Sequence, residues 1–165
     1  MELGEELPVH KEERIGGDYP LQMMTPHGRH SNNTSWRDHA LMLRLQRGQP
    51  VALMNAADAK ARGIADNDTA RVHNDIGSFQ INIMISRAVP PGLIMIYHAW
   101  EPYMFKGGHS YQTVTPSPIN PVELAGGYYH LQPMPLMCSP GENDRGVRIE
   151  VEKVEGAGAA TGLRI

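Results

Sequence analysis

Residues 25–35 form the densest group of side chains that could do chemistry. This polar stretch offers hydroxyl groups, side-chain amides, two imidazoles and the guanidinium of Arg29. Such groups can bind an oxyanion through side-chain and backbone donors, and Arg29 can add a charge-assisted contact. Three arginines follow within residues 37–47 against Asp38 alone. The stretch therefore favours an anionic ligand such as a phosphate, although the same residue types are also typical of a solvated loop that caps a helix.

Histidine and cysteine give a weaker signal, for a metal site or a nucleophile. His27 and His30 are three positions apart, and further histidines occur along the chain, but no carboxylate motif of the HExxH kind accompanies them. Hydrogen-bonding histidines are the simpler interpretation. The single cysteine, Cys138, can form no internal disulfide, no Cys-based zinc site and no iron–sulfur cluster. The sequence thus predicts no catalytic residue and no set of metal ligands.

Two later segments have side chains suited to a heterocycle. Asn120 carries a donor and an acceptor that can read a purine or pterin edge, or that can close a turn. Two aromatic residues flank His98 and Ala99 within residues 97–100. They suit the wall of a heterocycle site, and they equally suit the edge of a core.

Short strands joined by turns must position these residues. Apolar or alternating runs bounded by turn residues predict strands over 21–24, 51–54, 69–73, 78–86, 93–97 and 147–154. We expect the last of these to be edge-like. The alternation of Ile81, Ile83 and Ile85 with polar or flexible residues predicts one buried face for its strand.

Two short helices are expected between the strands. Residues 36–45 place Leu41 and Leu45 at helical spacing, and residues 56–62 consist mainly of strong helix formers. Asn55 is the expected N-cap of the second helix, and Gly63 stands where a C-cap residue belongs. Residues 101–121 are rich in Gly, Pro, Ser and Thr without a clear period, which predicts a long ordered loop.

The composition fits one domain with a real core. The chain has 165 residues, and no run approaches the roughly 18 apolar residues of a membrane span, so direct membrane insertion is not expected. Residues 1–14 account for the whole net charge of −3. The balanced remainder lacks the basic excess that phosphate-backbone binding needs, so no nucleic-acid partner is expected. We expect a flexible acidic leader over 1–18, a domain over 19–154 and a flexible tail over 155–165. No export signal is recognised, which leaves a periplasmic or cytoplasmic location open.

Several segments resemble one family in both order and spacing. Leu53–Asp68, Val72–Gly77 and Val89–Gly92 resemble the carboxy-terminal molybdopterin dinucleotide-binding domain of dimethyl sulfoxide reductase-type molybdenum enzymes. Tyr19–Arg29 and Tyr97–Glu101 resemble most closely one branch of that family. The branch holds the alpha subunits of nitrate, selenate, chlorate and perchlorate reductases and of dimethyl sulfide and ethylbenzene dehydrogenases.

The resemblance implies a mainly β fold, a double-psi β-barrel with short flanking helices. It implies a molybdenum bis(molybdopterin guanine dinucleotide) cofactor, bound jointly with domains outside this chain, so the chain alone should catalyse nothing. The implied partners are the remaining catalytic domains of the alpha subunit and an iron–sulfur electron-transfer subunit. The cofactor contacts carry over onto Thr25, His27, Gly28, Arg29, His30, Ser31, Thr34, His98, Asn120, Tyr129 and His130.

Two alternatives of other classes remain at this point. A fold does not fix a function, so the same barrel could serve a small enzyme such as a decarboxylase, although no activating nucleophile or self-processing motif is found. The histidines could also belong to a stand-alone interaction or metal-binding module. The substrate and the direction of electron transfer are not readable from these motifs.

Overall fold

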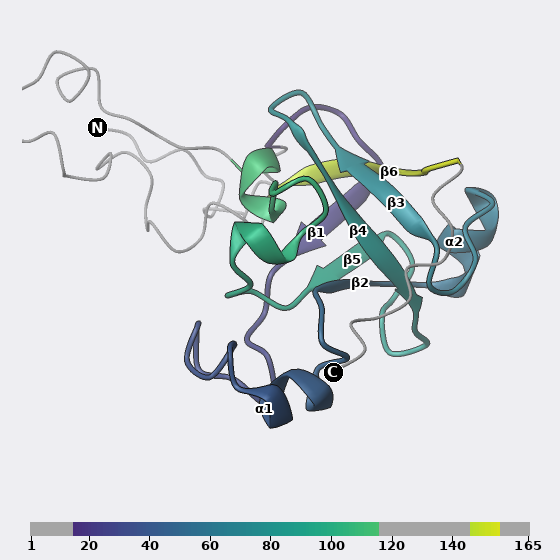
Figure 1. The fold of residues 1–165 in the computed structure, drawn as a ribbon. Coiled ribbons are helices and arrows are strands. Elements are labelled where there is room, and N and C mark those ends of the chain that lie inside the picture. The colour runs from purple at the N-terminus through teal and green to yellow at the C-terminus, as the bar shows by residue number, and fades with distance from the viewer. Residues whose placement is uncertain (1–14, 116–145, 156–165) are drawn as a thin grey trace, which may run out of the picture.

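A closed six-stranded β-barrel forms the centre of the computed structural model, which describes residues 15–115 and 146–155 (Figure 1). The strands are β1 (Leu21–Met24), β2 (Val51–Met54), β3 (Thr69–His73), β4 (Ser78–Ile85), β5 (Leu93–Ile96) and β6 (Arg148–Lys153). The helical segments among the described residues are α1 (Ala40–Leu45), α2 (Ala56–Ala61), η1 (Pro102–Met104) and η2 (Tyr111–Val114). This architecture confirms the mainly β barrel with short helices.

The barrel closes through strands that lie far apart in the sequence. In barrel order the strands run β1-β5-β2-β4-β3-β6, with β1 parallel to β5 and β2 parallel to β4. Strand β6 pairs antiparallel with both β1 and β3. The prediction that residues 147–154 form an edge-like strand is therefore wrong. Alternating charges on a strand resemble an edge pattern, but the pairing partners of β6 come from the first half of the chain and leave no local signal.

Apolar side chains that point inward fill the barrel. The fully buried residues come from most strands and include Leu21, Met23, Met54, Val72, Ile83, Ile94, Ile96, Ile149 and Val151. Each such side chain contributes roughly 1.5–3 kcal/mol by leaving water. Burial of these side chains inside the closed barrel is therefore the main contribution to the free energy of folding.

Strand β4 has the predicted buried face, and on its other face Asn82 is buried while Gln80 is exposed. Ile81 and Ile83 are buried as expected, but Asn82 is only 3% exposed, and its Oδ1 accepts a hydrogen bond from Thr69 Oγ1 at 3.1 Å. The reason is the segment after β5, because Gln80 of β4 forms an isolated bridge with Lys106. Lys106 also donates to Thr69 Oγ1, the partner of Asn82, so this segment lies close to Asn82 on the outer face.

The expected long loop over 101–121 contains two short 3-10 helices in its described part. Phe105, which follows η1, and Tyr111 and Val114 of η2 belong to the core. The Phe105 ring meets Phe79 edge-on at 6.0 Å and Tyr111 at 6.1 Å. Residues 116–121 lie outside the described residues. This segment therefore contributes to the core of the barrel.

Helix α2 agrees with its prediction to within one residue. The Asn55 side chain accepts a hydrogen bond from the Ala57 N–H at 2.9 Å, as expected of an N-cap. Its amide nitrogen also donates to the Val89 carbonyl at 2.8 Å. Gly63 follows with a φ of +64°, the left-handed conformation that glycine adopts without strain at the end of a helix.

Helix α1 is shorter than predicted, and its contact with the core is made by the partly buried Leu43. It begins at Ala40 rather than at residue 36, because residues 33–38 form turns in which Trp36 has a φ of +62°. No residue of α1 is buried, and Leu41 and Leu45 are 61% and 59% exposed. The helical spacing of the two leucines thus marks an exposed apolar face.

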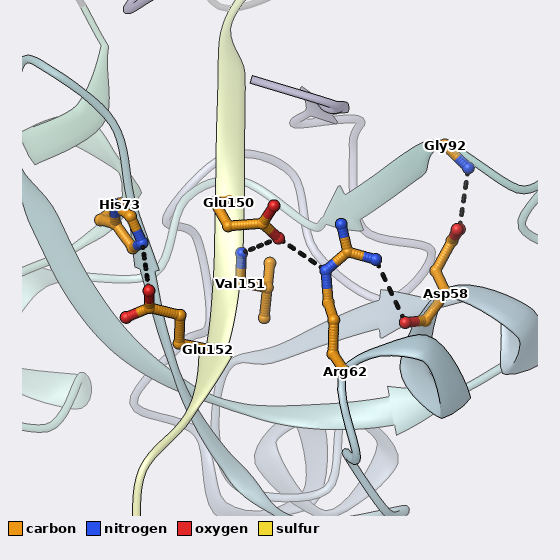
Figure 2. Close-up of polar contacts among 7 residues, drawn as sticks. All are labelled: Asp58, Arg62, His73, Gly92, Glu150, Val151 and Glu152. Atoms are coloured by element: carbon orange, nitrogen blue, oxygen red, sulfur yellow. Dashed lines mark hydrogen bonds and ion pairs between the residues drawn. The ribbon is translucent and has the colours of Figure 1, made fainter. Parts of the chain in front are cut away.

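On the side of α2, ion pairs and hydrogen bonds join that helix to β6 (Figure 2). Arg62 Nε lies 2.6 Å from Glu150 Oε1, which also accepts the Val151 N–H at 2.8 Å. Asp58 accepts the Gly92 N–H at 2.8 Å, and His73 Nε2 lies 3.3 Å from Glu152. We call this group the α2–β6 network. Ahead of β1, Ile15 forms an isolated β-bridge with Val147, the residue before β6.

Candidate functional site

The polar stretch and the segment after β5 meet at one end of the barrel. Strands β1 and β5 are parallel neighbours, with Met24 opposite Met95, so the loops that follow them leave from the same edge. The His98 N–H donates to the Pro26 carbonyl at 3.0 Å, which joins the two loops directly. Figure 1 shows α1, the continuation of the first loop, at this end and away from α2. We call residues 25–39 and 97–100 together the loop end.

The His98 imidazole lies between two parts of the first loop. Its Nδ1 is 3.3 Å from the Thr25 carbonyl oxygen, and its Nε2 is 3.2 Å from Asn33 Oδ1. The His27 ring lies edge-on to it, with the ring centroids 4.1 Å apart and an angle of 77° between the planes. His98 is half-buried, with both ring nitrogens beside groups of the loop, and the His27 ring next to it is exposed.

A buried guanidinium lies beneath this pair. Arg37 is only 2% exposed, and it donates from Nη2 to the His98 carbonyl at 2.8 Å and from Nε to the Ala99 carbonyl at 3.1 Å. Its Nη1 donates to the Gln46 side chain, and its central carbon lies 4.1 Å from the centroid of the Trp100 ring. Burial lowers the pKa of Arg37, but the group starts so far above neutrality that it stays charged.

In the sequence, Arg37 is one of three arginines that make residues 37–47 positively charged, and nothing near it indicates its structural position. Its partners His98 and Ala99 lie 61 and 62 residues further along the chain. No pattern near Arg37 indicates that contact. With the structure known, one sequence feature is consistent with the contact. Arg37 follows the polar loop and Trp100 follows β5, and the two side chains lie together.

Gly28 and Ser31 show that the first loop is closely packed from within. A Cβ atom added at Gly28 would lie 2.9 Å from Ser31 Oγ and 3.4 Å from Arg37 Nη2, so a larger residue would have to displace a neighbour. Ser31 Oγ is buried, and among the described residues it has no hydrogen-bond partner. A buried hydroxyl without a partner costs roughly 1–3 kcal/mol. The loop therefore has an unused polar group of the kind that a bound molecule satisfies.

The structure brings some of the predicted site residues together. Thr25, His27 and His98 are in contact, and Gly28 lies against Ser31. Three more predicted residues, Arg29, His30 and Thr34, stand on the same loop, where Arg29 and Thr34 are exposed and His30 is half-buried. The remaining three, Asn120, Tyr129 and His130, lie outside the described residues.

The charge of the loop suits an anion. Residues 25–37 contain two arginines and no aspartate or glutamate. In the described part of the chain, no group of three or more His, Cys, Asp or Glu side chains is arranged to hold a metal ion. The same part contains no helix that is long and apolar enough to span a membrane. The loop end thus offers N–H, hydroxyl and imidazole groups to a ligand rather than a set of metal ligands.

Comparison with known proteins identifies the family. Residues 21–131 match the family described as the molydopterin dinucleotide binding domain. The chain belongs to this family. The match starts at the first residue of β1 and includes five of the six barrel strands, the exception being β6.

Relatives of this molydopterin dinucleotide binding domain are much longer proteins. It is 37% identical to the respiratory nitrate reductase subunit alpha of Haloferax mediterranei, over 94% of this chain and 16% of the relative. It is 39% identical to the perchlorate reductase subunit alpha of Dechloromonas aromatica, over 95% of this chain and 17% of the relative. It is 35% identical to the dimethylsulfide dehydrogenase subunit alpha of Rhodovulum sulfidophilum, over 79% of this chain and 15% of the relative. The chain therefore spans less than a fifth of these relatives.

A solved structure shows that the fold of this molydopterin dinucleotide binding domain occurs elsewhere. The acetylene hydratase from Pelobacter acetylenicus superimposes with a TM-score of 0.59 at 18% identity. The superposition covers 82% of this chain and 18% of the hydratase. At that identity the likeness concerns the fold alone.

Proposed function

We propose that this chain is the carboxy-terminal domain of the catalytic alpha subunit of a molybdenum oxidoreductase. In this proposal it holds a molybdenum bis(molybdopterin guanine dinucleotide) cofactor jointly with the other domains of that subunit. The observation that carries the proposal is the convergence of residues 25–34 and His98 at one barrel end, in a chain of the molydopterin dinucleotide binding domain family. The relatives are alpha subunits of reductases and of a dehydrogenase, which is consistent with this role.

The residues present fit such a cofactor. The unpartnered Ser31 Oγ and the exposed Arg29 and Thr34 can donate to phosphate or pterin acceptors. Gly28 lets the loop pack closely on Ser31 and Arg37, and the rings of His27 and His98 can lie against a heterocycle. When bound, the cofactor supplies the redox chemistry, and the side chains of this domain hold and orient it.

The remaining assignments rest on the family resemblance. We include His30 with the phosphate donors of the loop, and Asn120, Tyr129 and His130 as pterin or nucleotide contacts. We place the domain boundaries at residues 19 and 154. The partners in this proposal are the other catalytic domains of the alpha subunit and an iron–sulfur subunit that transfers electrons.

The proposed function predicts that the native protein carries both molybdenum and guanine nucleotide. The test isolates the native protein with an antibody to this chain and measures polypeptide mass, molybdenum and acid-released guanine nucleotide in the same sample. We expect a polypeptide several times longer than 165 residues, or a tightly held catalytic partner, with both cofactor components. A lone chain of this length that contains neither component would contradict the proposal.

The site assignment is tested in the same enzyme by substitution. Arg29→Ala and Asn120→Ala should each lower the guanine nucleotide held per polypeptide, by about tenfold for a lost charged contact. Arg87→Ala is the matched control, since Arg87 is exposed and follows β4 rather than β1. Full nucleotide content in both site variants would contradict the assignment and leave the family membership intact.

A further inference from the structure

We propose that Arg37 is a positioning residue, which holds the His98 side chain in place against the cofactor loop. The inference rests on the proposed function, because it assigns His98 to the cofactor site. Arg37 itself is buried and does not touch the ligand side of the loop end. It acts through the backbone of the segment after β5, whose position sets that of the His98 ring.

The contacts of Arg37 join three parts of the chain. Its planar guanidinium donates to two successive carbonyls, those of His98 and Ala99, and lies over the ring of Trp100. It also donates to Gln46, which caps the end of α1. Its Nη2 is the side-chain atom that a Cβ at Gly28 would meet at 3.4 Å. The first loop, α1 and the segment after β5 are thus fixed to one group.

The backbone that Arg37 holds is strained. Ala99 has a φ of +70°, a left-handed conformation that costs a residue other than glycine roughly 1–2 kcal/mol. The Ala99 carbonyl accepts from Arg37 and the Ala99 N–H donates to the Tyr111 hydroxyl at 3.0 Å. Both polar groups of this peptide segment are therefore held from outside. Without the guanidinium, the turn that presents His98 has less to keep it in this conformation.

The partners of Arg37 are also unusual for a buried charge. Every contact described for its guanidinium is with a carbonyl, an amide or an aromatic ring, and none is with a carboxylate. Burying a charge without an opposite charge is costly, and hydrophobic residues of similar volume often stabilise a fold better. A residue whose only task was to fill this space would not need a guanidinium. The fork geometry, which reaches two adjacent carbonyls at once, is what lysine and glutamine cannot reproduce.

A double-mutant cycle in the full-length enzyme tests whether Arg37 acts through His98. The readout is the guanine nucleotide retained per polypeptide after gel filtration, together with the midpoint of thermal unfolding. We expect Arg37→Gln and His98→Gln each to lower retention by about tenfold, the size of one lost charged hydrogen bond. In the double variant the losses should not multiply, so that retention stays within about twofold of His98→Gln alone. Arg87→Gln, which removes an exposed charge, should retain the wild-type amount.

Arg37→Lys separates geometry from charge. A lysine keeps the positive charge but cannot donate to both carbonyls from a planar group, so we expect retention close to that of Arg37→Gln. If Arg37→Gln does not accumulate as folded enzyme, this milder variant decides the point. Wild-type retention in Arg37→Lys, or losses that multiply in the double variant, would overturn the inference.

The outcomes also distinguish this inference from the proposed function. Retention lost in His98→Gln but kept in Arg37→Gln would overturn the positioning role alone. A wild-type enzyme without guanine nucleotide would overturn the proposed function and the inference with it.

Discussion

The loop end and the α2–β6 network are built in opposite ways. In the α2–β6 network, the charge of Arg62 meets the opposite charge of Glu150, and the His73 ring lies beside Glu152 (Figure 2). At the loop end, the charge of Arg37 meets only neutral groups, and Ser31 Oγ has no partner among the described residues. Among the described residues, three of the five with positive φ other than glycine, namely Asn33, Trp36 and Ala99, also lie in the loop end.

The comparison indicates which part of the fold contains interactions that lower its stability. Backbone strain and unsatisfied polar groups persist only where the surrounding structure holds them in place, and they gather at functional sites. In the α2–β6 network, the carboxylates of Asp58 and Glu150 accept hydrogen bonds from neighbouring residues. Among the described residues, the loop end contains the unpartnered hydroxyl of Ser31 and the exposed ring of Trp36. Substitutions in the barrel, the network and α1 should therefore have effects of very different size.

The largest effect on stability is expected from the barrel that both regions share. Ile94 is fully buried on β5, and Ile94→Ala should lower the free energy of unfolding by about 3 kcal/mol through lost burial and the cavity left behind. Urea unfolding followed by circular dichroism measures this. Ile94→Val is the matched control and should cost only about 1 kcal/mol. If Ile94→Ala cost less unfolding free energy than Ile94→Val, the barrel core would not be the shared support of the loop end and the α2–β6 network.

The next largest effect is expected at Asn74, which joins the turn after β3 to two distant segments. Its Nδ2 donates to the Val114 carbonyl at 2.8 Å and to the Arg148 carbonyl at 3.1 Å. Its Oδ1 accepts from the Ile76 N–H at 2.9 Å. Asn74→Ala leaves these groups without partners and should cost about 2–3 kcal/mol in the same urea experiment. Asn74→Asp keeps the acceptor but loses the donor, so it should not restore the two carbonyl contacts.

A smaller and pH-dependent effect is expected in the α2–β6 network. Burial by itself raises the pKa of Glu150, but hydrogen bonds from Arg62 and the Val151 N–H, with the charges of Arg62 and His73, lower it below its ordinary value of 4.5. Because the folded state favours the carboxylate, the contribution is present above the ordinary pKa and is lost as the pH falls through the lowered one.

The test compares wild type with Glu150→Gln by urea unfolding at neutral pH and near pH 3. The wild type should be more stable by at most about 1 kcal/mol at neutral pH, since the pair is partly exposed, and this advantage should shrink at pH 3. An advantage that grows on acidification would contradict the assignment of the charges.

The smallest effect is expected at the exposed face of α1. Leu41→Ala and Leu45→Ala should each change the unfolding free energy by less than about 0.5 kcal/mol, because both side chains are already mostly exposed to solvent. A cost similar to that of Ile94→Ala would mean that Leu41 and Leu45 are buried in solution, and the contrast with the barrel core would fail.

Local pattern was sufficient for most elements of this fold. The strands over 21–24, 51–54 and 69–73 occur with the predicted bounds, because apolar runs between turn residues leave a clear signal. Asn55 caps α2 as its type and place predict. The start of α1 was missed because Asn33 and Trp36 adopt left-handed conformations, which the favourable spacing of the leucines does not reveal.

The local sequence pattern could not predict contacts between segments that lie far apart in the chain. The cover over Asn82 and the pairing of β6 on both sides depend on residues far along the chain. The position of Arg37 depends on His98 in the same way. For the candidate site, the chemistry of residues 25–35 predicted an anion-binding loop, and the family resemblance added His98. The arginine that holds the two together could be found only in three dimensions.

The closure of the barrel by β6 affects how the chain can fold during synthesis. Residues 148–153 pair with β1 and with β3, which the ribosome makes many residues earlier. Until β6 emerges, β1 and β3 each expose a row of unpaired N–H and C=O groups that can recruit another chain. Pairing across such sequence separations is also intrinsically slow. A nascent chain halted before Arg148 should therefore be prone to aggregate, although it already contains five of the six strands.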